Sequence, residues 1–335
     1  ISLVSFGDNT ISSTVNVNVA NNISRMTAST GTLTFDTSST IDTSGSTGTT
    51  SYNRYNEFGA INGFKVADIV VNGAVTGDGG FLFQGGNQVH WNPNATSGFT
   101  GQFRVQNGSF QQGGMLITSA GVLGDRNDTG TASVLDINGG IVEVRMDNPT
   151  LQVNDGSNAN AYFRSSATFA LDNAGGLSNT TFNQTLNLGD ILYEENRDFI
   201  AEGRNGFSLT VNSYSVNGGN NSQDVFSRLD GGGLLTITGD FSGNNDTGNR
   251  TYRFEDNGDT LITGGFMVGA GGNKILHKDG IGTLTIAGTN TSFVDVVDIT
   301  RGTIAITDFD SLGSGSTDTI KMSDEDIGLS GVGPS

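Results

Sequence analysis

The feature that most constrains this chain is a returning unit: a short β-branched run, a glycine, two or three residues and a second glycine. One such unit cannot bury its apolar side alone, so successive units have to stack on one another. Stacked units share a continuous core, which favours a repetitive all-β fold. The unit and its looser relatives occur at 69–77, 99–110, 135–144, 235–243, 261–269 and 296–306.

The runs within these units are three to five residues long, and side chains in such strands alternate with a period of two. Ile299, Ile304 and Ile306 can therefore share an interior face. Glycine after each strand permits a positive φ and a sharp corner, and coils then stack at a strand spacing of about 4.8 Å. With coils of about 20–25 residues, the pattern predicts a right-handed parallel β-helix, or β-solenoid, that forms a single elongated domain.

A β-sandwich is the structural competitor to this fold. The repeats weigh against it, as does the scarcity of Asn-Gly hairpins between long alternating strands. No segment of 12 residues has the periodicity of an amphipathic helix. Asparagine and threonine at equivalent corners can instead form side-chain ladders between stacked coils. We therefore expect an all-β chain.

The distribution of glycine divides the chain into parts. Residues 1–60 are rich in serine and threonine and contain the alternating run 14–19. This region is predicted to be an N-terminal cap or a strand region that pairs with another subunit. Residues 61–322 are predicted to form the β-helix, with loops bulging from it at about 150–230. Residues 323–335 are expected to form a tail.

The chain carries 34 acidic and 16 basic residues, a formal net charge of −18. Such a surface repels nucleic acid and anionic lipid, and no run of about 18 apolar residues occurs. We therefore expect no nucleic-acid partner and no membrane insertion by this chain. Cysteine is absent, which suits a protein that crosses an outer membrane unfolded. The chain opens at Ile1 without leader-like regions, so we expect any signal peptide to have been removed.

A family resemblance begins at residues 278–290, which read Lys-Asp-Gly-Ile-Gly-Thr-Leu-Thr-Ile-Ala-Gly-Thr-Asn. Ile-Thr-Arg-Gly-Thr-Ile follows at 299–304, and Ser-Leu-Gly at 311–313. Together these closely resemble the autotransporter-associated β-strand repeat, and residues 69–146 resemble a less regular copy. Phe293 stands where the family usually has tyrosine. The resemblance implies a β-helical passenger on the surface of a Gram-negative-type bacterium, or a free extracellular fibre.

No constellation for catalysis is readable, and we expect no enzymatic activity and no catalytic residues. Polysaccharide lyases and hydrolases with a β-helix fold use carboxylates with arginine or lysine on one face. Asp256 and Asp259, near Glu255, and a second acidic set at 324–326 are the candidate carboxylate pairs. Both sets lie in glycine-rich or terminal loops, and nothing in their spacing fixes the separation that glycoside hydrolysis requires.

We expect no cofactor beyond adventitious calcium, and the sequence assigns no metal ligands. An acidic extracellular protein meets calcium, which binds several oxygens. The turns at 125–128 and 244–246 are plausible calcium-binding turns, but neither matches an EF-hand loop. His277 lies beside Lys278, and one histidine cannot build a metal site.

Three side chains are candidate ligand-binding residues. Trp91 follows His90, and with Phe99 nearby an exposed Trp91 could form an aromatic platform for a sugar or a partner protein. A tryptophan that covers the end of the apolar core is the alternative. Tyr193 lies in a predicted side loop and is the third candidate.

These features predict a secreted or cell-surface structural rod or fibre subunit. Its expected partner is another copy of itself, added end to end, because an uncovered end of a β-helix exposes strand edges. The first alternative is an adhesin that binds glycans or extracellular matrix through loops at about 88–101 and 190–206. A polysaccharide-cleaving enzyme is the third hypothesis.

Overall fold

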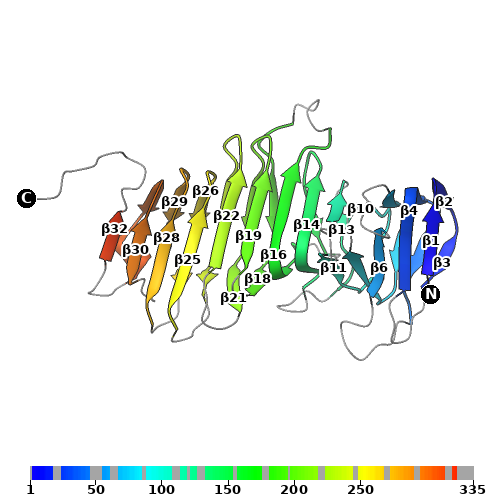
Figure 1. The fold of residues 1–335 in the computed structure, drawn as a ribbon, viewed down its shortest axis with the longest axis horizontal. Helices are drawn as coiled ribbons and strands as arrows, with labels where there is room; N and C mark the ends of the chain where they lie inside the picture. The colour runs from blue at the N-terminus through cyan, green and yellow to red at the C-terminus, as the bar shows by residue number, and fades with distance from the viewer. Residues whose placement is uncertain are drawn as a thin grey trace, which may run out of the picture. The chain divides into compact units, whose positions relative to one another are not determined.

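The fold is all-β and parallel in a computed structural model of the chain (Figure 1). The chain divides into two compact units, residues 1–192 (unit 1) and 193–335 (unit 2). The predicted parallel β-helix, or β-solenoid, is confirmed by coils of parallel strands in both. The structure describes residues 2–17, 24–45, 55–60, 67–84, 88–107, 114–118, 121–126, 133–153, 157–175, 181–194, 197–217, 223–243, 248–267, 272–289, 295–313 and 319–322.

The strands of unit 1 vary from two to twelve residues. They are β1 (Ser2–Phe6), β2 (Asn9–Ile11), β3 (Thr14–Asn16), β4 (Ser24–Phe35), β5 (Thr40–Asp42), β6 (Tyr55–Ala60), β7 (Ala67–Val71), β8 (Ala74–Thr76), β9 (Gly80–Gln84), β10 (Gln88–Trp91), β11 (Phe103–Gln106), β12 (Gly114–Ile117), β13 (Gly121–Val122), β14 (Leu135–Arg145), β15 (Leu151–Gln152), β16 (Ala161–Asp172) and β17 (Thr185–Leu188). β18 (Ile191–Glu194) spans the boundary between the units.

Unit 2 contains shorter and more regular strands, together with a 3₁₀ turn, η4 (Phe309–Leu312). The strands are β19 (Asp198–Gly203), β20 (Ser208–Val211), β21 (Tyr214–Asn217), β22 (Gln223–Leu229), β23 (Leu234–Ile237), β24 (Phe241–Ser242), β25 (Arg250–Glu255), β26 (Asp259–Ile262), β27 (Phe266–Met267), β28 (Lys274–Lys278), β29 (Thr283–Ile286), β30 (Val296–Ile299), β31 (Thr303–Ile306) and β32 (Thr319–Met322). Among the described residues of both units, no helix is long and apolar enough to cross a membrane.

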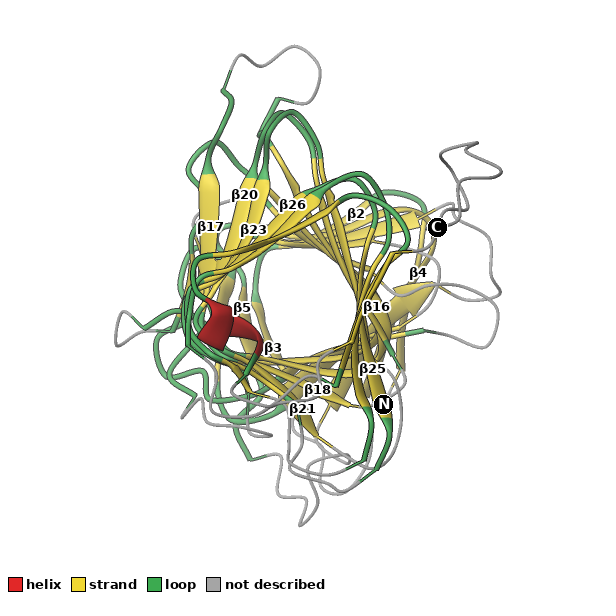
Figure 2. Ribbon diagram, turned by 90° about the vertical axis from the view of Figure 1, so that its left-hand side faces the viewer, coloured by secondary structure: helices red, strands yellow, loops and turns green. Residues whose placement is uncertain are grey.

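Each coil of unit 1 has three faces, seen end-on in Figure 2. Face 1 stacks β1, the first half of β4, β6, β9, β11 and the first halves of β14 and β16. Face 2 stacks β2, the second half of β4, β7, β10, β12 and the second halves of β14 and β16. Face 3 includes β3, β5 and β8. Gly139 and Gly140, with φ of 90° and 94°, bend β14 between faces 1 and 2.

Unit 2 repeats the same order of faces. Its face 1 stacks β21, β24 and β27, and its face 2 stacks β19, β22, β25, β28, β30 and β32. Face 3 stacks β20, β23, β26, β29 and β31. The strand register shows that the number of residues per coil varies more than the predicted range of about 20–25. Val89 pairs with Ile69, about 20 residues earlier, whereas Gly31 pairs with Ala67, about 36 residues later.

The core lies inside the coils, because alternate side chains of each strand turn inward. In β19 and β22, inward residues such as Phe199 and Val225 are buried, and outward residues are more exposed. Aromatic rings stack from coil to coil in unit 2. Tyr214 lies 4.8 Å from Phe241, which lies 5.0 Å from Phe266, between ring centroids.

Corners are joined by polar contacts and by close-packed glycines. The Asn92 amide donates to Asn72 Oδ1 at 3.3 Å, as the predicted side-chain ladder requires, whereas Thr263 Oγ1 donates to the backbone carbonyl of Thr238 at 3.0 Å. Glycine serves two purposes at these corners. Gly280 has the predicted positive φ, +83°. Gly264 instead lacks room, since a Cβ there would lie under 3.0 Å from the backbone of Gly239 in the previous coil.

The predicted parts of the chain map onto this fold as follows. Within residues 1–60, strands β1 to β5 pair in parallel like later coils, and a capping or subunit-pairing role stays a prediction. Residues 150–230, where bulging loops were predicted, include strands β15 to β22. The predicted tail, 323–335, lies outside the described residues.

Candidate functional site

Trp91 lies in the core of unit 1 and not at the surface. Its side chain is 2% exposed and its ring lies 5.1 Å from Phe81, 5.9 Å from Phe83 and 4.8 Å from Phe103. Phe99 is also fully buried. The alternation of β10 turns Trp91 inward, so of the two possibilities open for this residue the structure shows a core position and not an exposed platform.

Tyr193 also lies in the core, on strand β18 and not in a side loop. Its ring stacks on Tyr214, with centroids 5.9 Å apart and planes 13° apart. Burial, with a smaller contribution from the Asp198 carboxylate, raises the pKa of the Tyr193 phenol far above its ordinary value. The phenol is therefore neutral and enclosed, and its predicted exposure to a ligand is corrected.

Both histidines point outward from face 2 strands. His90 is 32% exposed, and its Nε2 lies 4.0 Å from Asp68 Oδ2. His277 lies nearer to its carboxylate, with Nδ1 3.3 Å from Asp298 Oδ2. Of the three predicted ligand-binding residues, His90 alone reaches the surface. The structure therefore does not bring them together at one exposed site.

A groove of about 570 Å³ lies between two stacked turns of unit 2, where the sequence placed its carboxylate pair. One turn contributes residues 228–233 and the other residues 256–259. Arg228 Nε donates to Asp256 Oδ2 at 2.6 Å, and Asp259 Oδ1 accepts the N–H of Thr283 at 2.8 Å. Each acid thus binds a neighbouring coil: the Asp256 bond crosses the groove, and the Asp259 bond joins its turn to the next coil.

Glu255 lies beside this groove on the outward side of β25. Burial raises the pKa of its carboxyl group, and the nearby carboxylates of Asp224 and Asp279 raise it further. The ionised form of Glu255 is therefore less favourable in the folded chain than in the unfolded chain. Its folded-state pKa lies above its unfolded value, so stability falls as pH rises through that interval.

Replacing Glu255 by glutamine is expected to raise the free energy of unfolding at neutral pH, because it removes a charge that folding disfavours. The gain should disappear below the ordinary glutamate pKa of 4.5, where both states are protonated. Urea unfolding at about pH 7 and about pH 3 measures this difference.

The control for Glu255 is Glu202→Gln, on the same face. Glu202 pairs in register with Arg228, so this change removes an opposite-charge pair and should lower stability by about 0.2–1 kcal/mol at neutral pH. A gain from Glu255→Gln that persists at low pH would contradict the assignment.

The predicted calcium turns are only partly described. Asp125 Oδ2 accepts the N–H of Gly98 at 2.6 Å, which ties it to the previous coil. Residues 127–128 and 244–246, together with the acidic set at 324–326, lie outside the described residues. Within the described residues, no group of three or more histidine, aspartate or glutamate side chains could hold a metal ion.

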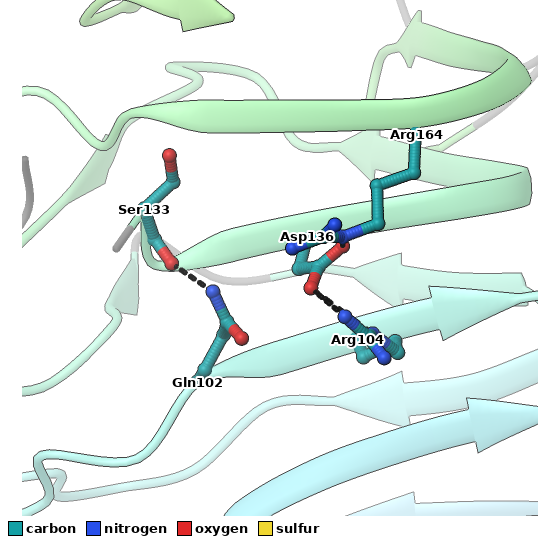
Figure 3. A network of polar contacts seen from close by, with 5 residues as sticks. All are labelled: Gln102, Arg104, Ser133, Asp136 and Arg164. Carbon is teal, nitrogen blue, oxygen red and sulfur yellow. Dashed lines mark hydrogen bonds and ion pairs between the residues drawn. The ribbon is translucent and has the colours of Figure 1, made fainter. Parts of the chain in front are cut away.

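A buried ionic network in unit 1 was missed by sequence reasoning (Figure 3). The Asp136 carboxylate is fully buried on β14, between Arg104 of β11 and Arg164 of β16. Arg104 Nε donates to Oδ2 at 3.0 Å, and Arg164 Nε donates to Oδ1 at 2.9 Å. Beside it, Gln102 Nε2 donates to the carbonyl of Ser133 at 2.6 Å. The network joins three consecutive coils.

The signal for this network in the sequence is a charged residue between two apolar neighbours, as at Arg104 and Asp136. Its partners lie about 30 residues apart, so the coil length must be known before they can be matched. Arg164 also lies over the Tyr162 ring, 4.1 Å from its centroid. The arrangement binds coils together and leaves the carboxylate enclosed.

Comparison with known proteins adds no relative: no family model, no curated protein and no solved structure matches the chain.

Proposed function

We propose that this chain is an extracellular structural subunit, of the kind carried by autotransporter-like passengers, that assembles end to end into fibres. In this proposal it has no enzymatic activity and needs no cofactor. The β-solenoid fold is compatible with such a passenger. The described acids of the groove support a structural role, since Asp256 and Asp259 each bind a neighbouring coil.

The observation that carries the proposal is the incomplete burial of the face 3 strand β31. In interior strand β29, Leu284 and Ile286 are fully buried. Their register partners in β31, Ile304 and Ile306, are only half-buried. Within the described residues, β31 pairs with β29 alone. A further coil stacked on β31 would bury these two side chains.

The first coil of a second copy can supply that further coil. Within the described residues, β1 and β3 each pair on one side only. Leu3 and Phe6 of β1 are 37% and 70% exposed. All strand pairs named here are parallel, so only a head-to-tail contact continues the ladder. A heterologous contact of this kind produces open filaments.

Electron microscopy and light scattering of residues 1–335 over a range of concentrations test this proposal. We expect filaments whose formation is suppressed by Phe6→Lys, because a charge at a strand edge blocks further pairing. Phe182→Lys is the matched control, since Phe182 is 51% exposed and lies outside any strand. Circular dichroism melts check that both variants fold. Monodisperse single chains at every concentration would contradict the proposal.

The adhesin alternative is weaker, because its two aromatic contact residues, Trp91 and Tyr193, are buried. Glycan-array binding by the intact chain would favour that alternative over the fibre.

A further inference from the structure

Face 3 of unit 2 presents a nearly uncharged outer surface. Its strands alternate between half-buried outward residues and buried inward residues, as in β20, β23 and β29. The outward residues form two rows across the five strands. One row contains Thr210, Thr236, Leu261, Thr285 and Ala305, and the other contains Ser208, Leu234, Asp259, Thr283 and Thr303.

Asp259 is the single charged residue in these two rows, and its Oδ1 already accepts the N–H of Thr283. The surface is therefore made of hydroxyl and methyl groups at the regular spacing of the strands. Thr236 and Thr285 represent it well, because each is half-buried and flanked in register by an uncharged residue.

Face 2 of the same unit is, by contrast, strongly charged. Arg253 Nη1 lies 3.0 Å from Asp224 Oδ1, and His277 lies 3.3 Å from Asp298. Its outward positions include Asp198, Glu202, Asp224, Arg228, Arg253, Glu255, His277, Asp298 and Lys321. A partner that covered face 2 would have to desolvate these charges, which costs free energy unless each one is paired.

We propose that face 3 of unit 2 is a lateral docking surface for a second copy of this chain. Each copy carries a net charge of −18, so two copies repel one another over most of their surfaces. On face 3 they can approach with less burial of like charge than on face 2, and threonine methyl groups and leucine side chains can pack there. This side-to-side contact is separate from the end-to-end contact proposed above and does not require it.

The size of the surface decides how strong this contact can be. Five strands spaced about 4.8 Å apart, each four residues of about 3.3 Å, cover roughly 300 Å². A stable complex buries about 800 Å² on each partner. One pair of copies should therefore associate weakly, whereas copies joined in a filament would associate strongly through many such contacts at once.

Salt dependence distinguishes this contact from one made by charged groups. The electrostatic term between two acidic copies is repulsive, and added salt screens it. Association through face 3 should therefore strengthen between about 0.05 M and about 0.5 M sodium chloride. Association through opposite charges on face 2 would weaken over the same interval.

Sedimentation equilibrium of residues 1–335 in the Phe6→Lys background, which suppresses end-to-end addition, tests the proposal. We expect weak dimers that strengthen with salt, and an association constant at least about tenfold lower in Thr236→Lys, because a lysine there must be desolvated. Thr251→Lys is the matched control, since Thr251 is a half-buried outward threonine on face 2. Circular dichroism confirms that each variant is folded.

Three results would overturn the lateral contact: no association at high salt, association that weakens with salt, or equal effects of the two threonine variants. None of them bears on end-to-end filaments, because electron microscopy tests those separately on the chain that keeps Phe6. If electron microscopy shows filaments that do not associate side by side at high salt, the proposed function stands and the lateral contact is contradicted.

Discussion

Replacing Asp136 by asparagine is expected to lower the free energy of unfolding by about 3–5 kcal/mol. The Asp136 side chain is fully buried, and Arg104 and Arg164 are 5% and 21% exposed. Asparagine has nearly the same shape but no charge, so the buried guanidinium of Arg104 and the half-buried one of Arg164 lose their shared counter-charge. Removing one partner of a buried ionic network costs far more than the network contributes, because the desolvation of the remaining charges is no longer offset.

Urea unfolding followed by circular dichroism measures this effect, with Asp68→Asn as the control. Asp68 also belongs to unit 1 and lies 4.0 Å from His90, but it is 49% exposed. Loss of an exposed pair should change stability by at most about 1 kcal/mol. Equal effects of the two substitutions would show that the Asp136 network is not enclosed as described.

Replacing Gly264 by alanine is expected to cost about 3 kcal/mol or more, because the new methyl group has nowhere to go. A Cβ on Gly264 would lie under 3.0 Å from backbone atoms of Gly239 and Asp240. Backbone of a stacked coil cannot rotate away as a side chain can, so the coils would have to separate at this corner. Gly239 and Gly288 are constrained in the same way by Asn212 and Gly264.

Gly232→Ala is the matched control in the same unit. Gly232 has φ of +90°, but nothing lies within 4 Å of a Cβ built there. Its replacement should cost only the strain of a left-handed backbone, about 1–2 kcal/mol. Thermal and urea unfolding of both variants compare the two. If the control proved the more damaging, backbone conformation and not coil stacking would be the reason for glycine at these corners.

Local pattern alone identified much of this fold. The alternation of β-branched residues with glycine predicted parallel coils, since a strand with one apolar side must be stacked to bury it. The same reasoning placed Ile299, Ile304 and Ile306 on one interior face. In the structure Ile299 lies on face 2 and the other two on face 3, and all three are only half-buried. Ladders such as Asn72 with Asn92 followed from the same argument.

The candidate site was harder to predict, because exposure depends on neighbours far away in sequence. The sequence left Trp91 open between an exposed platform and a cover of the core, and it placed Tyr193 in a side loop. Both side chains are enclosed by rings from other coils. Alternation within β10 and β18 decides which way they point, and the ends of those strands are not marked in the sequence. If the register of a strand shifts by one residue, each inward side chain of that strand turns outward.

The amino-acid sequence by itself determined that this chain is β-helical, acidic and repetitive, because those properties depend on composition and on a period of two. Only the tertiary structure decided which residues meet. Coil length varies from about 20 to about 36 residues, so the partners of Asp136, the carbonyl facing Gly264 and the uncharged rows of face 3 follow from register. Register is a property of stacked coils, set by how their cores and corners pack together.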